Sequence, residues 1–199
     1  MHAERSWAWG VLAIALLAGG AAPSDATSLV RAGLDNLVAG NGTIVVGEVR
    51  DAYSYWNADR TFILTDVRVA VGEILKGNPR QREITVTLLG GTVGDLTTVI
   101  VGGAELARGK SYLLFLNEED LPGLKAAQSV RDHCQGVFEI VRARDGMRAV
   151  SQANGQPLHP DALGFVDVPG GLTGLPLGAM RQSIREIAGR QDIHGEVQR

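Results

Sequence analysis

Apolar and polar residues alternate through the central part of the chain, as in β-strands that bury one face. Residues 43–56 (TIVVGEVRDAYSYW) and 60–77 (RTFILTDVRVAVGEILKG) are long, rich in β-branched residues and separated by a short polar turn. This pattern predicts two long strands joined as a hairpin. Gly47 and Gly72 fall inside these strands, where a glycine usually marks a bulge or a sharp bend.

Further strands are predicted downstream, at residues 83–89, 96–103, 111–117 and 135–150. The last of these segments contains Asp145-Gly146, the strongest tight-hairpin signal in the chain. Residues 118–133 are predicted to form a polar loop. Antiparallel strands with closely spaced turns predict a mainly β domain, either a barrel or a sandwich, and long first strands bent at glycines favour a small closed or partly open barrel.

Helical spacing occurs on either side of the strands. Residues 27–41 place Leu34, Leu37 and Val38 on one face, and this predicts a short amphipathic helix capped by Thr27 or Ser28. Residues 177–188 have a second apolar stripe, which predicts a C-terminal helix packed on an apolar surface. Between the strands and this helix, residues 153–176 are rich in Gly, Pro and polar residues, as in an extended arm.

The first residues of the chain have the three parts of a secretory signal peptide. Arg5 precedes an apolar run over residues 7–17, and small residues follow, with Ser24 and Ala26 at the −3 and −1 positions of a cleavage site. A membrane anchor is the alternative, but the run is shorter than the roughly 20 residues that span a bilayer. We therefore expect cleavage after Ala26 and export to the periplasm or the medium. The expected organisation is a signal peptide at 1–26, a β-barrel domain at 27–152, and an arm with the C-terminal helix at 153–199.

Charge and cysteine content exclude several classes of function. The net charge is −3, with 19 basic and 22 acidic residues and no basic block. This balance argues against nucleic acid or an anionic membrane as the main partner. Cys134 is the only cysteine, so an exported chain of this kind cannot be a disulfide scaffold and must rely on its apolar core.

The order of these motifs resembles a group of uncharacterised exported bacterial proteins. The motifs are VVGEV, a strand ending in VGEILKG, the glycine-broken LLGGTVG, then GKSYLLFL and QGVFEI, all within residues 42–141. Those proteins are in turn similar to the netrin-module and tissue-inhibitor-of-metalloproteinases type of oligonucleotide/oligosaccharide-binding (OB) barrel. The resemblance implies such a barrel, and it leaves an exported protease open as a partner.

The resemblance does not extend to the inhibitory device of the animal proteins. Those inhibitors chelate the protease zinc through an N-terminal cysteine, whereas here the expected mature N-terminus is Thr27 and no cysteine precedes Cys134. Modulation of a metalloprotease would therefore need another contact surface.

No pattern of catalytic, metal-binding or cofactor-binding residues stands out. His133 and Cys134 are adjacent, but neighbouring residues rarely face one another, and neither a second cysteine nor an HxxxH pair completes a zinc site. The glycine-rich stretches match neither GxxxxGK[ST] nor GxGxxG. We therefore expect no metal, no cofactor and no enzymatic activity, with an enzyme whose site is assembled from distant residues as the alternative.

Three aromatic residues near the first turn are the best surface candidates. Tyr53, Tyr55 and Trp56 lie at the end of the first predicted strand. Aromatic side chains at such a position offer a large contact area at low entropic cost. The alternative is that they cover the edge of the core. The sequence thus predicts a non-enzymatic interaction module with a protein partner, and a modulator of an exported metalloprotease is the narrower alternative.

Overall fold

Two long paired strands form the largest part of the fold. The computed structural model describes residues 32–78, 82–130, 134–155 and 174–196. In it, β1 (Thr43–Trp56) and β2 (Ile63–Lys76) pair antiparallel along almost their whole length, as the alternation predicts. Glycine bends this hairpin where expected, because Val46 lies opposite Glu73 and Gly47 opposite Val71, which leaves Gly72 as the extra residue of a bulge.

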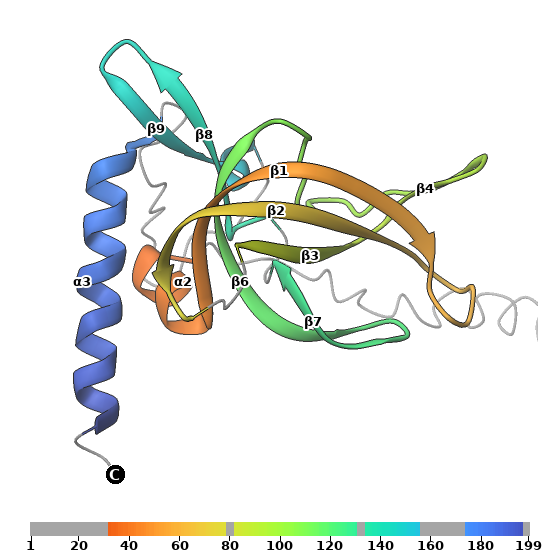
Figure 1. Ribbon diagram of the computed structural model, residues 1–199, viewed down its shortest axis with the longest axis horizontal. Helices are drawn as coiled ribbons and strands as arrows, with labels where there is room; N and C mark the ends of the chain where they lie inside the picture. Colours follow the sequence, from red (N-terminus) through yellow and green to blue (C-terminus); the bar gives the residue numbers. More distant parts are fainter. Residues whose placement is uncertain (1–31, 79–81, 131–133, 156–173, 197–199) are drawn as a thin grey trace, which may run out of the picture.

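The fold is mainly β with two described helices (Figure 1). The main sheet has eight strands in the order β10-β9-β8-β6-β1-β2-β3, with β7 paired to the outer part of β6. The remaining elements are α2 (Leu34–Gly40), β3 (Glu83–Leu89), β4 (Gly91–Val93), β5 (Leu96–Thr98), β6 (Ser111–Leu121), β7 (Leu124–Val130), β8 (Val137–Ala143), β9 (Gly146–Ser151), the 3₁₀ turn η1 (Gln152–Gly155), β10 (Leu175–Pro176) and α3 (Leu177–Glu196). β4 and β5 form a separate two-stranded sheet.

Strand β6 lies at the centre of the sheet, and its first half is buried on both faces. Its first half lies between β1 and β8, and its second half pairs with β7. Leu113 and Phe115 point to one apolar cluster, and Tyr112, Leu114 and Leu116 point to another. A run of five apolar residues without polar interruption is what such a strand requires.

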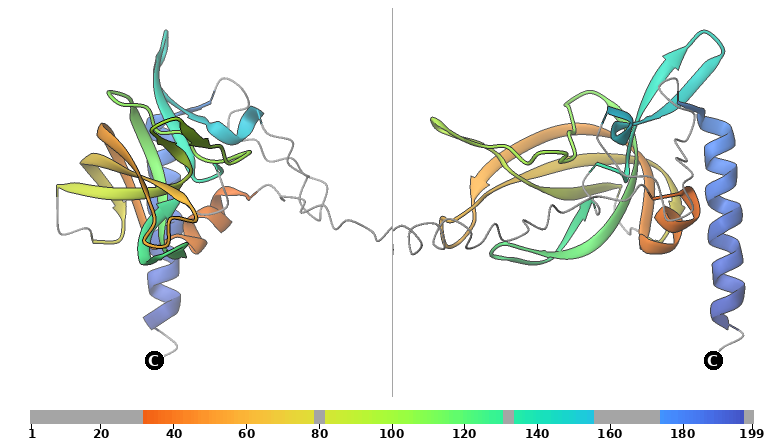
Figure 2. Two further views of the ribbon diagram at one scale, coloured as in Figure 1. Left: turned by 90° about the vertical axis from the view of Figure 1, so that its right-hand side faces the viewer. Right: turned by 180° about the vertical axis from the view of Figure 1, so that it is seen from behind.

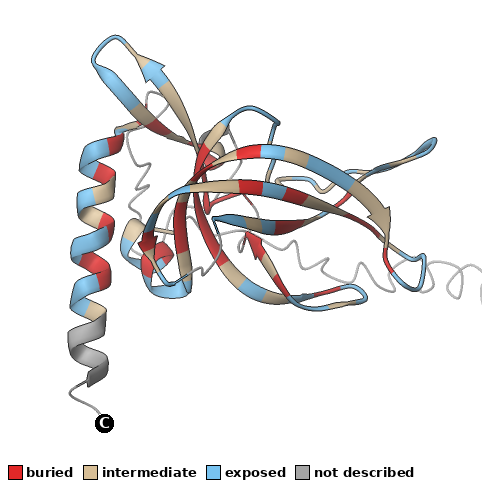
Figure 3. Ribbon diagram, viewed as in Figure 1, coloured by how far each residue is buried: buried red, intermediate tan, exposed pale blue. Residues whose placement is uncertain are grey.

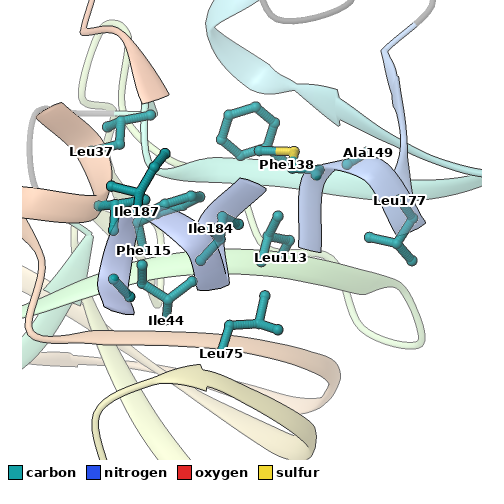
Figure 4. Close-up of a cluster of buried hydrophobic side chains, with 13 residues drawn as sticks. Leu37, Ile44, Leu75, Leu113, Phe115, Phe138, Ala149, Leu177, Ile184 and Ile187 are labelled. Atoms are coloured by element: carbon teal, nitrogen blue, oxygen red, sulfur yellow. The ribbon is translucent and has the colours of Figure 1, made fainter. Parts of the chain in front are cut away.

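The first cluster lies under the two helices (Figure 4). Met180, Ile184 and Ile187 of α3 pack there against β6 and β8, and Leu37 of α2 packs against the same cluster. Figure 3 shows this stripe as the buried side of α3, with exposed residues on the opposite side. Arg181 pairs with Glu73 of β2 at 2.7 Å, and Arg185 pairs with the same carboxylate. The C-terminal helix predicted from the stripe is therefore confirmed.

Both helix boundaries differ from the expectation. α2 begins at Leu34 with Gly33 as its N-cap, so the helix predicted over residues 27–41 is wrong at residues 32 and 33. The predicted cap, Thr27 or Ser28, lies outside the described residues. α3 continues past Gly189 to Glu196. A single glycine costs a helix only about 1 kcal/mol, and contacts of the last turns with the body oppose this cost, such as Lys76 Nζ to Gln191 Oε1 at 3.2 Å.

The predicted loop at residues 118–133 is wrong over residues 118–130. That segment extends β6 to Leu121 and then forms β7, while residues 131–133 lie outside the described part. The strand was missed because charged residues interrupt its alternation of apolar and polar positions. Glu119 lies opposite Ala127, which is buried, and Asp120 lies at a bulge. The predicted strand at 96–103 is also too long, because β5 ends at Thr98.

The sheet curls so that β7 approaches β3. Ser129 Oγ of β7 donates to the Thr87 carbonyl of β3 at 2.7 Å. No ladder joins these two strands in the residues that the structure describes, so the sheet is open at this point. The expected barrel, closed or partly open, is therefore not established.

The predicted signal peptide at 1–26, including Ala26, lies outside the described residues, as does most of the arm at 153–176. Among the described residues no helix is both long and apolar enough to span a membrane.

Candidate functional site

The aromatic end of β1 presents two stacked tyrosines. The rings of Tyr53 and Tyr55 lie with their centroids 6.1 Å apart and their planes 12° from parallel, on the same face of the strand. Tyr53 is 71% exposed, whereas Tyr55 is half-buried. Trp56, also half-buried, alternates with Tyr55 and so belongs to the opposite face together with Ser54. The structure thus brings together two of the three aromatic candidates and separates the third.

A carboxylate on the neighbouring strand fixes the inner tyrosine. Asp66 Oδ1 accepts a hydrogen bond from the Tyr55 hydroxyl at 3.1 Å and another from Thr87 Oγ1 at 2.7 Å. Burial raises the pKa of the Tyr55 hydroxyl above its ordinary value, and the Asp66 carboxylate raises this pKa further. The hydroxyl therefore stays protonated and keeps donating. We call Tyr53, Tyr55 and Asp66 the tyrosine face.

The turn next to the tyrosine face is also held in place. Asn57 is 4% exposed, and its Oδ1 accepts from the backbone N–H groups of Thr61 and Phe62. Its Nδ2 donates to Thr61 Oγ1 at 3.0 Å and to the Pro122 carbonyl in the turn between β6 and β7 at 3.3 Å. One asparagine thus closes the first hairpin and attaches it to the second. A rigid support of this kind lowers the entropic cost of binding through the tyrosines.

Apolar side chains lie beneath the tyrosine face. Tyr55 packs with Phe62 and Leu124 against a small buried cluster of Leu64, Leu121 and Ala127. The inner tyrosine is therefore part of the core edge and the outer one is not. Of the two alternatives that the sequence left open for the tyrosines, core edge or contact surface, the first describes Tyr55, whereas the ring of Tyr53 is exposed.

Replacing Tyr55 with phenylalanine should lower the free energy of unfolding by about 1 kcal/mol, because the ring and its packing stay while the bond to Asp66 is lost. Urea denaturation measures the change. Tyr53→Phe is the matched control, and it should shift stability by less than about 0.5 kcal/mol because its ring is mostly in solvent. Equal losses in the two variants would contradict the role assigned to Asp66.

The structure describes only one residue of the predicted His133–Cys134 pair. Cys134 is 2% exposed, and such burial is typical of a structural thiol and not of a reactive one. His133 lies outside the described residues. In the described part of the chain, no three His, Cys, Asp or Glu side chains are placed to hold a metal ion.

Sequence reasoning missed a second exposed surface, on the β4–β5 hairpin. Among the described residues, four of the seven exposed large apolar side chains lie between residues 89 and 101: Leu89, Leu96, Val99 and Val101. Figures 1 and 2 show the hairpin projecting from the end of the molecule away from α3. The sequence held a signal for this surface, because residues 84–104 contain only one charged residue, Asp95.

No family model matches this chain, and no curated protein is significantly similar to it.

Proposed function

We propose that this protein is an exported, non-enzymatic binding module that holds a protein partner on its tyrosine face. The observation that carries the proposal is the exposed ring of Tyr53, 71% accessible and stacked on a tyrosine that is itself fixed by Asp66. Large, exposed and pre-ordered aromatic rings are typical centres of protein–protein contacts. Export rests on the signal-like sequence of residues 1–26.

We further propose that the strands correspond to a partly open barrel of the OB or netrin-module type. The order β3-β2-β1-β6-β7 and the bond from Ser129 to Thr87 support this assignment. On such a barrel the first hairpin commonly contributes to ligand binding. The tyrosine face lies on that hairpin.

The test is co-purification of a tagged chain from a cell that exports it, followed by calorimetry with the purified partner. Tyr53→Ala should weaken the interaction at least fivefold, since contact residues of this kind contribute more than about 1 kcal/mol. Ile74→Ala is the control, because Ile74 is also exposed, at 42%, but lies near the other end of the first hairpin.

Two outcomes would count against the proposal. A partner that binds Tyr53→Ala as tightly as the unmodified chain would place the contact elsewhere. A chain that turns over a substrate without any partner would remove the non-enzymatic assignment.

A further inference from the structure

Asp66 is a half-buried carboxylate that uses only one of its two oxygens. The hydrogen bonds from the Tyr55 hydroxyl and from Thr87 Oγ1 both reach Oδ1. The other oxygen, Oδ2, accepts no bond from the described residues and is accessible to solvent. Because a carboxylate partly removed from water favours a cation beside it, Oδ2 is an open position for one.

Every other acidic residue of β1, β2 and β3 forms an ion pair with arginine. Asp66 has no such partner among the described residues. Arg68 follows it by two positions on β2, but its guanidinium is already shared between two other carboxylates. Asp66 is therefore available to a cation from another molecule. The existing pairs are Glu48 with Arg50, Asp51 and Glu83 with Arg68, and Glu73 with both Arg181 and Arg185.

The exposed ring of Tyr53 lies next to this carboxylate. Tyr53 and Asp66 are directly opposite each other on β1 and β2, and side chains paired in this way share a face with their Cβ atoms about 5 Å apart. One side of the Tyr53 ring is stacked on Tyr55, and because the residue is 71% exposed the other side is accessible. The face of an aromatic ring attracts cations. A cation against Tyr53 would therefore meet an aromatic face and a negative charge together.

Arginine matches this combination better than other cations do. Its planar guanidinium stacks on aromatic rings, pairs with carboxylates and gives up its water more easily than an ammonium group. Lysine carries a compact, strongly hydrated charge, which pairs with a carboxylate but does not stack. A metal ion needs several oxygen ligands, and no three His, Cys, Asp or Glu side chains of the described residues are placed to hold one.

We propose that the protein partner of the tyrosine face presents an arginine side chain, which stacks on Tyr53 and pairs with Asp66 Oδ2. This inference rests on the proposed function and adds the chemistry by which the partner is recognised. The net charge of the whole chain, −3, attracts a basic segment of a partner. Because the contact lies at the surface, added salt should weaken it.

NMR titration of the isotope-labelled chain with the capped peptide acetyl-Gly-Arg-Gly-amide tests the proposal. The amide signals of Tyr53 and Asp66 should shift as peptide is added. The same peptide with citrulline in place of arginine has nearly the same shape but no charge, and it should leave these signals unchanged.

Two variants of one hairpin separate the charge of Asp66 from its structural role. Asp66→Asn should weaken binding of the arginine peptide by about fivefold or more, because it keeps an acceptor oxygen for Tyr55 and Thr87 but loses the charge. Asp59→Asn is the matched control. It removes a charge from the exposed turn of the same hairpin and should bind the peptide as the unmodified chain does.

Three outcomes would overturn the proposal. The first two are equal shifts with the citrulline peptide and unchanged binding by Asp66→Asn. The third is no shift at Tyr53 up to about 0.1 M peptide, far above the dissociation constant on the order of 1 mM expected of one such contact. Circular dichroism checks that Asp66→Asn is folded. If it is not, Tyr53→Leu, which removes the aromatic ring at an exposed position, takes its place.

Failure of this inference can be told apart from failure of the proposed function. A co-purified partner that depends on Tyr53 but binds Asp66→Asn normally would overturn the arginine contact alone. Peptide binding at Tyr53 in a chain that captures no partner would support the arginine site and count against the proposed function.

Discussion

Phe115→Ala should lower the free energy of unfolding by about 3–5 kcal/mol, the usual cost of truncating a buried aromatic residue. Phe115 is completely buried in the cluster under the helices, with its ring centroid 5.7 Å from that of Phe138 (Figure 4). The side chain joins β6 to residues of both α2 and α3 in that cluster. Removing it leaves a cavity where strand and helices meet, and a rigid sheet cannot close over such a cavity.

Urea denaturation followed by circular dichroism measures this loss. Since a domain of this size is stable by only about 5–15 kcal/mol, the midpoint of the transition should fall markedly. Ile74→Ala is the control on an exposed position and should change stability by less than about 0.5 kcal/mol. Similar midpoints for the two variants would mean that the helices are not packed on β6 as described.

Gly47→Ala should lower the free energy of unfolding by about 1–3 kcal/mol, the cost of overpacking a close contact. An added Cβ would lie 2.5 Å from Val69 Cγ1 and 2.8 Å from the Ala70 carbonyl oxygen. The second of these atoms is backbone, so β1 and β2 would have to move apart at the centre of the sheet. The loss would come from steric overlap and not from the conformation of the glycine.

Gly72→Ala is the matched control in the same bulge. Its added Cβ would meet only the Val46 carbonyl oxygen, at 3.6 Å, which is an ordinary contact. We expect it to be neutral or to stabilise the fold by up to about 1 kcal/mol, because alanine restricts the unfolded chain more than glycine does. If both variants lost the same stability, the bulge itself and not the close approach at Gly47 would set the requirement for glycine.

The long first hairpin could be predicted because its residues obey a local rule. The β1 bounds match the predicted range, and Gly72 lies at a bulge, as glycines inside strands do. The C-terminal helix was predictable for the same reason, since its apolar stripe has helical spacing. In both cases the spacing along the chain already determines which face is buried.

Strand β7 and the tyrosine face depend on residues distant in sequence, so the sequence could not place them. β7 exists because its residues pair with the charged end of β6, and a segment with this charge resembles a loop. The separation of Trp56 from the two tyrosines follows from strand alternation and could have been predicted. The role of Asp66 could not, because it depends on how β1, β2 and β3 are aligned.

The cluster under the helices draws on both ends of the described chain. Leu37 and Ile44 lie near its beginning, whereas Met180, Ile184 and Ile187 come more than 130 residues later. While the chain is being synthesised, β1 and β6 can therefore pair before the residues that cover their apolar face have left the ribosome. Contacts between such distant residues slow folding and leave apolar surface exposed in the meantime. The nascent chain should therefore depend on holding chaperones until α3 has been made.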